Sequence, residues 1–369
     1  MACIALDATY TVDPEPSGVA VYSRRLIEAL ASTDAQHRFL LCYRLSRFGQ
    51  RKEFLRPTKP PGARGPYFSI RMYQEYLTFW LPWQARLFHS LAQRPPAFHF
   101  EKEVVTIFDI FPITGKDYST PDFQRKFAAL LREAVARAAR VITLSEYTAG
   151  QLVKHLETPR EKIRVISAGV DFPTIVLDGA ERAKERERWV GQGNEMVLSV
   201  GALQTRKNTL NALRALQSLP SNYRMVWAGG NGHGSEAIHE FIRREGLASR
   251  VVTPGYVSAD RLPELYQAAS IFLFPSFEEG FGFPILEAMT HGVPVVAANA
   301  SSLPELGGEA VLYADPNDPG QIASQVRRVI EDVSLRQQMI VSGEARAREF
   351  SWSKAAEATL GVYEELLAK

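Results

Sequence analysis

Short apolar runs alternate with helical patterns along this chain, in two separate series. In the first series the apolar runs lie at 4–6, 39–41, 104–107 and 141–144, and the helical patterns lie at 19–30 and 123–139. A second series has apolar runs at 196–200, 225–228, 251–252, 271–274, 293–296 and 310–313. Such alternation is typical of βαβ units on a parallel sheet. The sequence therefore predicts an α/β fold with two Rossmann-like, doubly wound domains that face each other across a cleft between the C-terminal edges of their sheets.

The length of 369 residues also favours two domains, because one hydrophobic core seldom serves so long a chain. The alternation fails at 171–195, where the charged run at 181–188 predicts a solvated helix that marks the interdomain connection. We therefore expect a first domain at 1–170, a second at 171–350 and a final helical segment at 351–369. That last segment is amphipathic and is expected to pack near the domain junction.

The composition narrows the environment and the partners. With 43 basic and 41 acidic residues the net charge is only +2, so no general attraction to nucleic acid is expected. Cys3 and Cys42 are too few for a disulfide framework and lack metal-ligand spacing. The N-terminus lacks the regions of a signal peptide, and no apolar stretch approaches the roughly 20 residues that span a bilayer. We expect a cytoplasmic protein with, at most, peripheral membrane contact.

A glycine-rich turn between Glu279 and Glu287 is the most informative local motif. It follows the apolar run at 271–274, and Pro284 suits the first position of a helix that begins beside Gly282. The first amides of a helix have no intrahelical partner and lie at the positive end of its dipole, so they can hold a diphosphate. Glycines at 280 and 282 let the backbone approach such a ligand closely.

Two carboxylates flank this turn and could contact one ligand in different ways. Carboxylates accept hydrogen bonds from sugar hydroxyls, each worth about 1.5–3 kcal/mol in a dry site. The alternative is that Glu279 caps the helix and Glu287 is solvated. The surrounding glycines, strand and helix favour the ligand-binding interpretation.

A basic loop follows the first strand of the second series. It runs from Val200 through Gly201, Arg206 and Lys207 to Asn208, which could cap the next helix. This loop shares a sheet edge with the Glu279 turn. The two cations could therefore neutralise a leaving diphosphate, although such a pair is often only solvated surface.

Weaker candidates also lie at strand ends or helix starts. Tyr256 and Val257 follow a strand and offer an aromatic ring and backbone groups near a base pocket. Gly18 begins a helix, where it either lets amides face a ligand or belongs to an ordinary Ser-capped start. Asp109 ends a strand and is either a contact to the transferred group or acceptor, or a turn residue.

Two further features carry less weight. His89 and His99 could line the cleft, but lone histidines are more often structural or exposed. The aromatic segment at 66–83 is either core or acceptor wall, which we favour, or an interfacial helix that meets a lipid-linked acceptor.

Taken together, these residues resemble the retaining glycosyltransferases of family 4, which have the two-domain GT-B fold. The likeness covers nearly the whole chain. Its most specific part is 275–289, which looks like the family's E-x7-E signature. The segment at 200–208 is similar to the diphosphate-binding basic loop, 17–19 to the N-terminal glycine loop, and the helix from Trp352 to the segment that crosses back to the first domain.

The resemblance implies roles for the two glutamates. Glu279 would contact hydroxyls of the donor sugar and Glu287 the ribose, in a C-terminal domain that binds the nucleotide-sugar donor; the N-terminal domain would be on the acceptor side. The implied catalytic residues are Glu279, Asp109, Arg206 and Lys207. The implied donor-binding residues are Gly18, Gly201, Arg206, Lys207, Tyr256, Val257, Glu279, Gly280, Phe281, Gly282, Phe283 and Glu287.

In this family the acceptor attacks from the face that the nucleotide leaves, the departing phosphate helps to take the proton, and configuration is retained. No metal or other cofactor is then expected, in agreement with the lack of an Asp-x-Asp element. Two departures bear on sugar preference and rate. Phe108 stands where many members have histidine, and Ala202 where many have arginine, which leaves Arg206 as the substitute.

The resemblance thus implies transfer of a hexose from GDP-mannose or a UDP-hexose to a glycan or lipid-linked acceptor in polysaccharide or glycolipid biosynthesis. One alternative is a non-catalytic scaffold that binds sugar nucleotides. A GT-B sugar-nucleotide epimerase is a weaker alternative, because it needs further acid and base groups, and only Asp109, His89 and His99 are available.

Overall fold

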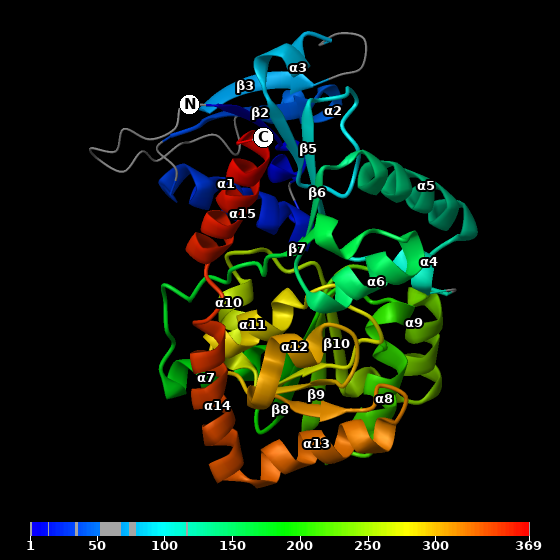
Figure 1. Ribbon diagram of the computed structural model, residues 1–369. Coiled ribbons are helices and arrows are strands. Elements are labelled where there is room, and N and C mark those ends of the chain that lie inside the picture. The colour runs from blue at the N-terminus through cyan, green and yellow to red at the C-terminus, as the bar shows by residue number, and fades with distance from the viewer. Residues whose placement is uncertain are drawn as a thin grey trace. The chain divides into compact units, whose positions relative to one another are not determined.

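The computed structural model describes residues 2–13, 15–33, 36–51, 68–73, 79–115 and 117–368. The chain divides into two compact units (Figure 1). Unit 1 comprises Met1–Thr114, Pro121–Gly169 and Ser351–Lys369, and unit 2 comprises Gly115–Thr120 and Val170–Phe350. Each unit has its own parallel sheet, so the predicted α/β class with two doubly wound domains is confirmed.

Seven parallel strands form the sheet of unit 1, in the order β3-β2-β1-β4-β5-β6-β7. Their bounds are β1 Cys3–Asp7, β2 Arg38–Arg44, β3 Phe68–Tyr73, β4 Leu87–Ser90, β5 Lys102–Ile107, β6 Arg140–Thr143 and β7 Ile163–Val165. In the register at the centre, Ala5 lies opposite Leu40 on one side and Phe88 on the other. The strand order reverses between β1 and β4, which makes this the topological switch point of the sheet.

Helices cover this sheet, and the last helix of the chain belongs to the same unit. The helices are α1 Gly18–Thr33, α2 Leu45–Phe48, α3 Leu81–Gln84, α4 Phe111–Thr114, α5 Pro121–Arg137, α6 Glu146–Leu156 and α15 Trp352–Leu367, with 3-10 turns η1 Thr9–Val12 and η3 Arg160–Lys162. Helix α15 packs beside α1 (Figure 1). On β4, His89 is buried and hydrogen-bonds through Nδ1 to Tyr363 of α15 (2.6 Å) and through Nε2 to Thr106 of β5 (2.8 Å). Burial lowers the pKa of His89 to about 3, so this histidine is a neutral structural residue.

Unit 2 holds a six-stranded parallel sheet in the order β10-β9-β8-β11-β12-β13. The strands are β8 Glu195–Val200, β9 Tyr223–Ala228, β10 Val251–Gly255, β11 Ile271–Phe274, β12 Val295–Ala298 and β13 Leu312–Ala314. The helices are α7 Gly179–Val190, α8 Thr209–Gln217, α9 Ser235–Arg244, α10 Leu262–Ala268, α11 Phe283–Thr290, α12 Leu303–Gly307, α13 Pro319–Glu331 and α14 Val333–Ala347, with 3-10 turns η4 Thr205–Lys207, η5 Leu247–Ser249 and η6 Gly308–Ala310. Here the order reverses between β8 and β11.

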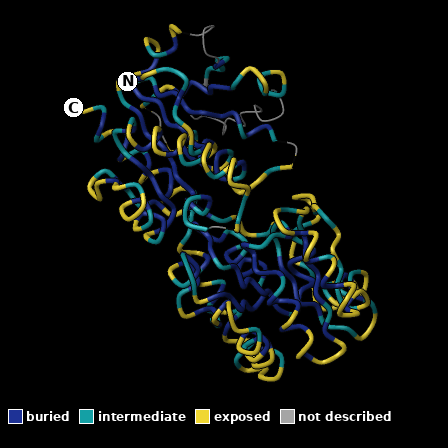
Figure 2. Tube along the Cα trace, turned by 90° about the vertical axis from the view of Figure 1, so that its right-hand side faces the viewer, coloured by how far each residue is buried: buried dark blue, intermediate teal, exposed yellow. Residues whose placement is uncertain are grey.

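The buried strands and exposed helix faces follow the sequence pattern. Central strands such as β4 and β11 are buried throughout, as parallel strands covered on both faces must be. Figure 2 shows buried segments in the interior and exposed ones at the periphery. Apolar side chains of strands and helices share the core of unit 2, among them Val197, Leu213, Trp227, Leu273 and Val326.

The sequence patterns missed β3, β4 and β7. Each of these strands carries polar residues or is very short, so no continuous apolar run reveals it; β7 has three residues, Ile163–Val165. The other predicted strands all appear, and the predicted final helix begins at Trp352, as expected, and ends at Leu367.

The charged run at 181–188 forms a helix, as predicted, but its expected place was wrong. This helix, α7, packs on α10 inside unit 2 and is not a connection between the units. Its Glu185 is buried and pairs with Arg188 (2.6 Å) and Arg261 (3.1 Å).

The aromatic segment at 66–83 is core only in part. Its residues 68–73 form β3, in which Tyr73 is buried, whereas Phe79, Trp80 and Trp83 are 60%, 42% and 82% exposed. Residues 66–67 and 74–78 lie outside the described residues. Over the described ranges, no helix combines the length and apolar character that a bilayer crossing requires.

Candidate functional site

The candidate site lies at the topological switch point of the unit 2 sheet. Strands β8 and β11 are direct neighbours there, with Leu198 opposite Phe272. The loop after β8 carries Arg206 and Lys207, and the loop after β11 carries Glu279. The backbone N–H of Phe277 donates to the carbonyl of Arg206 (3.0 Å), which joins the two loops. The structure therefore brings the basic loop and the glycine-rich turn together at one sheet edge.

A buried ion-pair cluster forms where these loops meet. Lys207 Nζ is 2.6 Å from Glu279 Oε1, and Arg206 Nη1 is 2.9 Å from Glu279 Oε2. Arg206 also donates to the carbonyl of Glu278, and Lys207 Nζ lies 4.6 Å from the centre of the Phe274 ring. All three charged side chains are buried. Two cations thus share the carboxylate of Glu279.

The charge state of Glu279 follows from this cluster. Burial alone raises the pKa of the carboxyl group, but the charges of Arg206 and Lys207 and their hydrogen bonds outweigh it and bring the pKa to about 2. A depressed pKa means that the stabilisation is present above the unfolded pKa and is lost only as the pH falls toward 2. Glu279 is therefore ionised at neutral pH and acts as an acceptor of hydrogen bonds.

Two serines that the sequence patterns did not single out hold the glycine-rich turn. Ser302 Oγ donates to the carbonyls of Glu279 (2.9 Å) and Phe281 (2.7 Å), and Ser301 Oγ accepts from the N–H of Glu279 (3.0 Å). Both serines follow β12, the next strand of the sheet. Their position after a strand end is the only sequence signal that could have indicated them.

Helix α11 begins at this turn. Its N-cap is Gly282, whose φ of 116° favours glycine, and a Cβ there would lie 2.9 Å from Leu303 Cδ2. The helix starts at Phe283, one residue earlier than predicted, with Pro284 in its first turn. Gly280 and Phe281 are buried within the turn. The start of α11 thus lies in the loop that carries Glu279.

Glu287 belongs to a second polar cluster, farther along α11. Tyr266 of α10 is buried and donates from its hydroxyl to Glu287 Oε2 (2.7 Å). The Tyr266 ring stacks on His291 with centroids 5.2 Å apart, and His291 Nδ1 lies 2.6 Å from the carbonyl of Glu287. Burial raises the pKa of Glu287; the Tyr266 hydrogen bond lowers it, and the charge of Asp171 raises it further. Tyr266 thus orients one carboxylate oxygen of Glu287.

The start of the basic loop depends on close backbone packing. Gly201 has a φ of 134°, and a Cβ there would lie 3.1 Å from Lys207 Cε. Asn208 does not cap α8 with its side chain, contrary to expectation. Its amide instead donates to the carbonyls of Pro275 (2.9 Å) and Pro316 (2.6 Å), because its backbone is left-handed, with φ 58°.

The remaining candidate residues belong to other strands and helices. Tyr256 and Val257 follow β10, which β9 and β8 separate from β11, and Tyr256 is exposed. In unit 1, Gly18 is the first residue of α1, and the N–H of Ala20 donates to Ser17 Oγ (3.4 Å), as in a Ser-capped start.

Three further residues of unit 1 were named from the sequence. Asp109 follows β5, and its N–H donates to Gln93 Oε1 (3.3 Å). Phe108, which replaces the family's histidine, packs edge-on against Tyr22, with centroids 5.0 Å apart. His99 is exposed and lies 3.8 Å from Glu103 Oε1.

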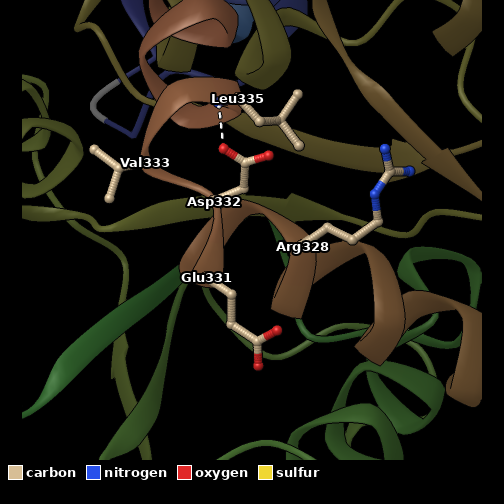
Figure 3. Close-up of a pocket in the computed structure, with 5 residues that line it drawn as sticks. All are labelled: Arg328, Glu331, Asp332, Val333 and Leu335. Atoms are coloured by element: carbon tan, nitrogen blue, oxygen red, sulfur yellow. Dashed lines mark hydrogen bonds between the residues drawn. The ribbon is translucent and has the colours of Figure 1, made fainter.

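A hollow elsewhere in unit 2 contains none of the candidate residues. It lies between α13 and α14, has a volume of about 490 Å³ and is lined by Arg328, Glu331, Asp332, Val333 and Leu335 (Figure 3). Asp332 accepts from the N–H of Leu335 (2.9 Å) and so caps α14. The carboxylate of Asp332 is thus engaged in helix capping.

Comparison with known proteins places the chain in a family. The family described as "Glycosyltransferase Family 4" matches residues 16–172, and the family described as "Glycosyl transferases group 1" matches residues 181–346. The O-antigen chain mannosyltransferase B of Escherichia coli is 32% identical over 307 residues, which are 81% of this chain and 77% of that protein.

Other relatives are matched over less of their length. The serotype-specific mannosyltransferase WbdA of Escherichia coli is 27% identical over 72% of this chain but only 34% of its own length. The D-inositol 3-phosphate glycosyltransferase of Acidothermus cellulolyticus is 33% identical over 64% of this chain and 55% of its own length.

Solved structures share the fold over the whole chain. Anabaena Alr3699/HepE in complex with UDP-glucose has a TM-score of 0.76 at 19% identity, and it covers 100% of both chains. Sucrose-phosphate synthase from Thermosynechococcus elongatus has a TM-score of 0.75 at 20% identity, also with 100% of both chains covered. With family matches on both halves and a relative matched over most of its length, this protein belongs to glycosyltransferase family 4 and is a glycosyltransferase of the GT-B type.

Proposed function

We propose that this glycosyltransferase moves a hexose from a nucleotide-sugar donor to a glycan or lipid-linked acceptor in polysaccharide or glycolipid biosynthesis. The observation that carries the proposal is the cluster of Glu279, Arg206 and Lys207 at the switch point of unit 2, in contact with the turn that begins α11. GDP-mannose is the favoured donor, because the relative matched over most of its length is named a mannosyltransferase. A UDP-hexose is the second choice.

In this proposal each residue of the site has a separate role. Glu287 accepts hydrogen bonds from the ribose, while Arg206 and Lys207 hold the diphosphate beside the turn that begins α11 and neutralise the charge that builds as it leaves. Glu279 accepts hydrogen bonds from the hexose. The two buried cations supply positive charge at the diphosphate, which supports transfer without a metal ion. In the proposed reaction the leaving phosphate helps to take the acceptor's proton, and the sugar keeps its configuration.

Thermal stabilisation by donors is the direct test of this proposal. The purified protein is heated with GDP-mannose and with UDP-, ADP- and dTDP-sugars, because a ligand at about 100 times its dissociation constant adds roughly 2.7 kcal/mol to the free energy of unfolding. We expect one nucleotide class to raise Tm and Glu287→Ala to abolish that shift. Stabilisation of wild type and variant alike would contradict the assignment of Glu287, and binding without transfer would favour the scaffold.

Retention of configuration and independence from metal are tested by an assay of the transfer reaction. With the donor found above, the anomeric configuration of the product is read by NMR, and the rate is compared with and without a chelator. Retention and an unchanged rate are expected. An inverted product or a rate restored only by divalent metal would contradict these parts alone.

Tyr266→Phe is expected to weaken nucleotide binding by roughly tenfold, because one charge-assisted hydrogen bond that orients Glu287 is lost. The same change removes the contact that lowers the pKa of Glu287. The ionised form, which accepts from the ribose, is lost as the pH falls through this raised pKa. Wild-type affinity should therefore drop in mildly acid solution, and that of Tyr266→Phe should drop at higher pH.

The control for this prediction is Tyr313→Phe. Tyr313 also lies in unit 2 and donates from its hydroxyl to a backbone carbonyl, that of Gly308 (2.9 Å), so the variant loses a comparable bond away from Glu287. Calorimetric titration across mildly acid to neutral pH gives both affinity profiles. If the two variants had the same profile, Tyr266 would be a packing residue only.

A further inference from the structure

A small hollow opens at the switch point of the unit 1 sheet, where the order of strands reverses between β1 and β4. Ligands of open α/β sheets bind outside the carboxyl ends of strands at such points. Segments that follow β1, β2 and β4 line the hollow, chiefly with Thr9, Tyr10, Asp13, Arg44, Arg47 and Arg94. Its volume of about 140 Å³ exceeds the roughly 10–15 Å³ that one water needs.

Positive charge dominates this hollow. Three arginines and one acidic residue, Asp13, line it, so the formal excess of charge is +2. Within the described part of the chain, Arg44 Nε is buried without a hydrogen-bond partner, and no carboxylate forms an ion pair with Arg44, Arg47 or Arg94. Arg47 donates to Gln50 Oε1, at 3.4 Å. An arrangement of this kind is suited to an anion, because guanidinium groups match the oxygen geometry of phosphate.

The wall that follows β1 is fixed by hydrogen bonds. The N–H of Thr9 donates to Asp7 Oδ1 (3.0 Å), and the N–H of Arg44 donates to Thr9 Oγ1 (3.2 Å). Arg24 of α1 donates to the carbonyls of Thr11 and, at 3.1 Å, Asp13. This wall is therefore held by β2 and α1 without any ligand.

The wall that follows β4 is fixed as well. Gln93 adopts a left-handed backbone with φ 57°, which a residue other than glycine rarely does. Its side-chain oxygen accepts from the N–H groups of Phe108 (3.0 Å) and Asp109 (3.3 Å), at the end of β5. Ser90 Oγ donates to the carbonyl of Arg94 (2.5 Å). The backbone that carries Arg94 is thus tied to β4 and β5.

We propose that this arginine hollow binds a phosphoryl group of the acceptor, and that Asp13 accepts a hydrogen bond from a neighbouring hydroxyl of the same molecule. The inference rests on the proposed function, because it assigns the anion to an acceptor. The phosphoryl group belongs either to a free sugar phosphate or to the diphosphate of a lipid-linked sugar. Both sources present the same chemistry to Arg44, Arg47 and Arg94.

The test measures binding of a sugar 1-phosphate and of its parent sugar to the full chain by calorimetry, with and without a saturating nucleoside diphosphate that occupies the unit 2 site. The phosphate ester is expected to bind and the sugar to bind far more weakly. Arg94→Gln and Arg47→Gln should each weaken binding of the ester by about tenfold, and Arg94→Glu should abolish it. Arg132→Gln, an exposed arginine of α5, is the matched control and should bind as wild type.

A second experiment measures binding to vesicles that carry a polyprenyl diphosphate sugar, with the same variants. Arginine-dependent binding of either probe supports the proposal and identifies the source of the phosphoryl group. Binding that Arg94→Gln and Arg47→Gln leave unchanged, or failure of both probes to bind, would overturn it. The nucleotide measurement is independent of this test. If the wild type bound no nucleotide, the proposed function would be refuted, while the nucleotide-free titration would still test the arginine hollow.

Discussion

Replacing Glu279 with glutamine is expected to slow glycosyl transfer by roughly ten- to a hundredfold and to tighten the binding of the bare nucleoside diphosphate. In the structure, the carboxylate of Glu279 contacts both Lys207 (2.6 Å) and Arg206 (2.9 Å). A neutral side chain leaves these two cations without their shared partner, so an incoming diphosphate gains more by binding them. The hexose, in contrast, loses a charged acceptor of hydrogen bonds.

The same variant should be less stable without ligand. Removing one partner of a buried ion pair costs about 3–5 kcal/mol, since the remaining charge is left buried and uncompensated. A nucleoside diphosphate should therefore raise the Tm of Glu279→Gln by more than that of the wild type. Differential scanning calorimetry with and without the nucleotide measures the stability and the stabilisation by the nucleotide. Initial rates measure the effect on transfer.

Glu103→Gln provides the control for Glu279→Gln. Glu103 is buried in unit 1 and pairs with Arg137 at 2.8 Å, so its replacement also breaks a buried ion pair. It should lower the stability comparably and leave the nucleotide affinity unchanged. Equal or weaker nucleotide stabilisation of Glu279→Gln, compared with wild type, would mean that Arg206 and Lys207 do not hold the diphosphate.

Gly229→Ala is expected to destabilise the protein by roughly 3 kcal/mol or more and to weaken nucleotide binding. Gly229 follows β9 with a φ of 155°, and a Cβ there would lie only 2.1 Å from the carbonyl oxygen of Gly201. Backbone atoms cannot give way as a flexible side chain does. The first residues of the basic loop would therefore shift, and Lys207, which packs 3.1 Å from the Cβ position of Gly201, would shift with them.

The adjacent Gly230→Ala is a close control, because a Cβ at Gly230 meets nothing within 4 Å. Urea unfolding of both variants gives the free energies, and nucleotide titration gives the affinities. We expect Gly230→Ala to resemble the wild type in both. Similar values for the two variants would show that the approach of Gly229 to Gly201 does not hold the loop in place.

Much of the fold was predictable because its signals are local. Each sheet has buried parallel strands, and continuous apolar runs such as 271–274 reveal them without reference to the rest of the chain. The strands that escaped prediction lack this signal: β7 has only three residues, and β4 includes His89. The start of α11 was predictable to within one residue, because Gly282 and Pro284 are local signals for the start of a helix.

The candidate site was predictable only in part. The sequence indicated that Arg206, Lys207 and Glu279 share a sheet edge, but not that one carboxylate pairs with both cations. It gave no indication that Tyr266 orients Glu287, that Ser301 and Ser302 hold the turn, or that three arginines of unit 1 line one hollow. These contacts join separate elements whose side chains are not related by any helix or strand period.

By itself, then, the sequence determined the α/β class, the two series of strands and the glycine-rich turn, since each depends on residues close together in the chain. Tertiary structure decided which charges meet. Lys207 and Glu279 are 72 residues apart, and they form a 2.6 Å ion pair only because β8 and β11 are neighbours in the sheet. Burial then fixes the chemistry, because the same carboxylate in water would keep an ordinary pKa, whereas beside two buried cations its pKa falls to about 2.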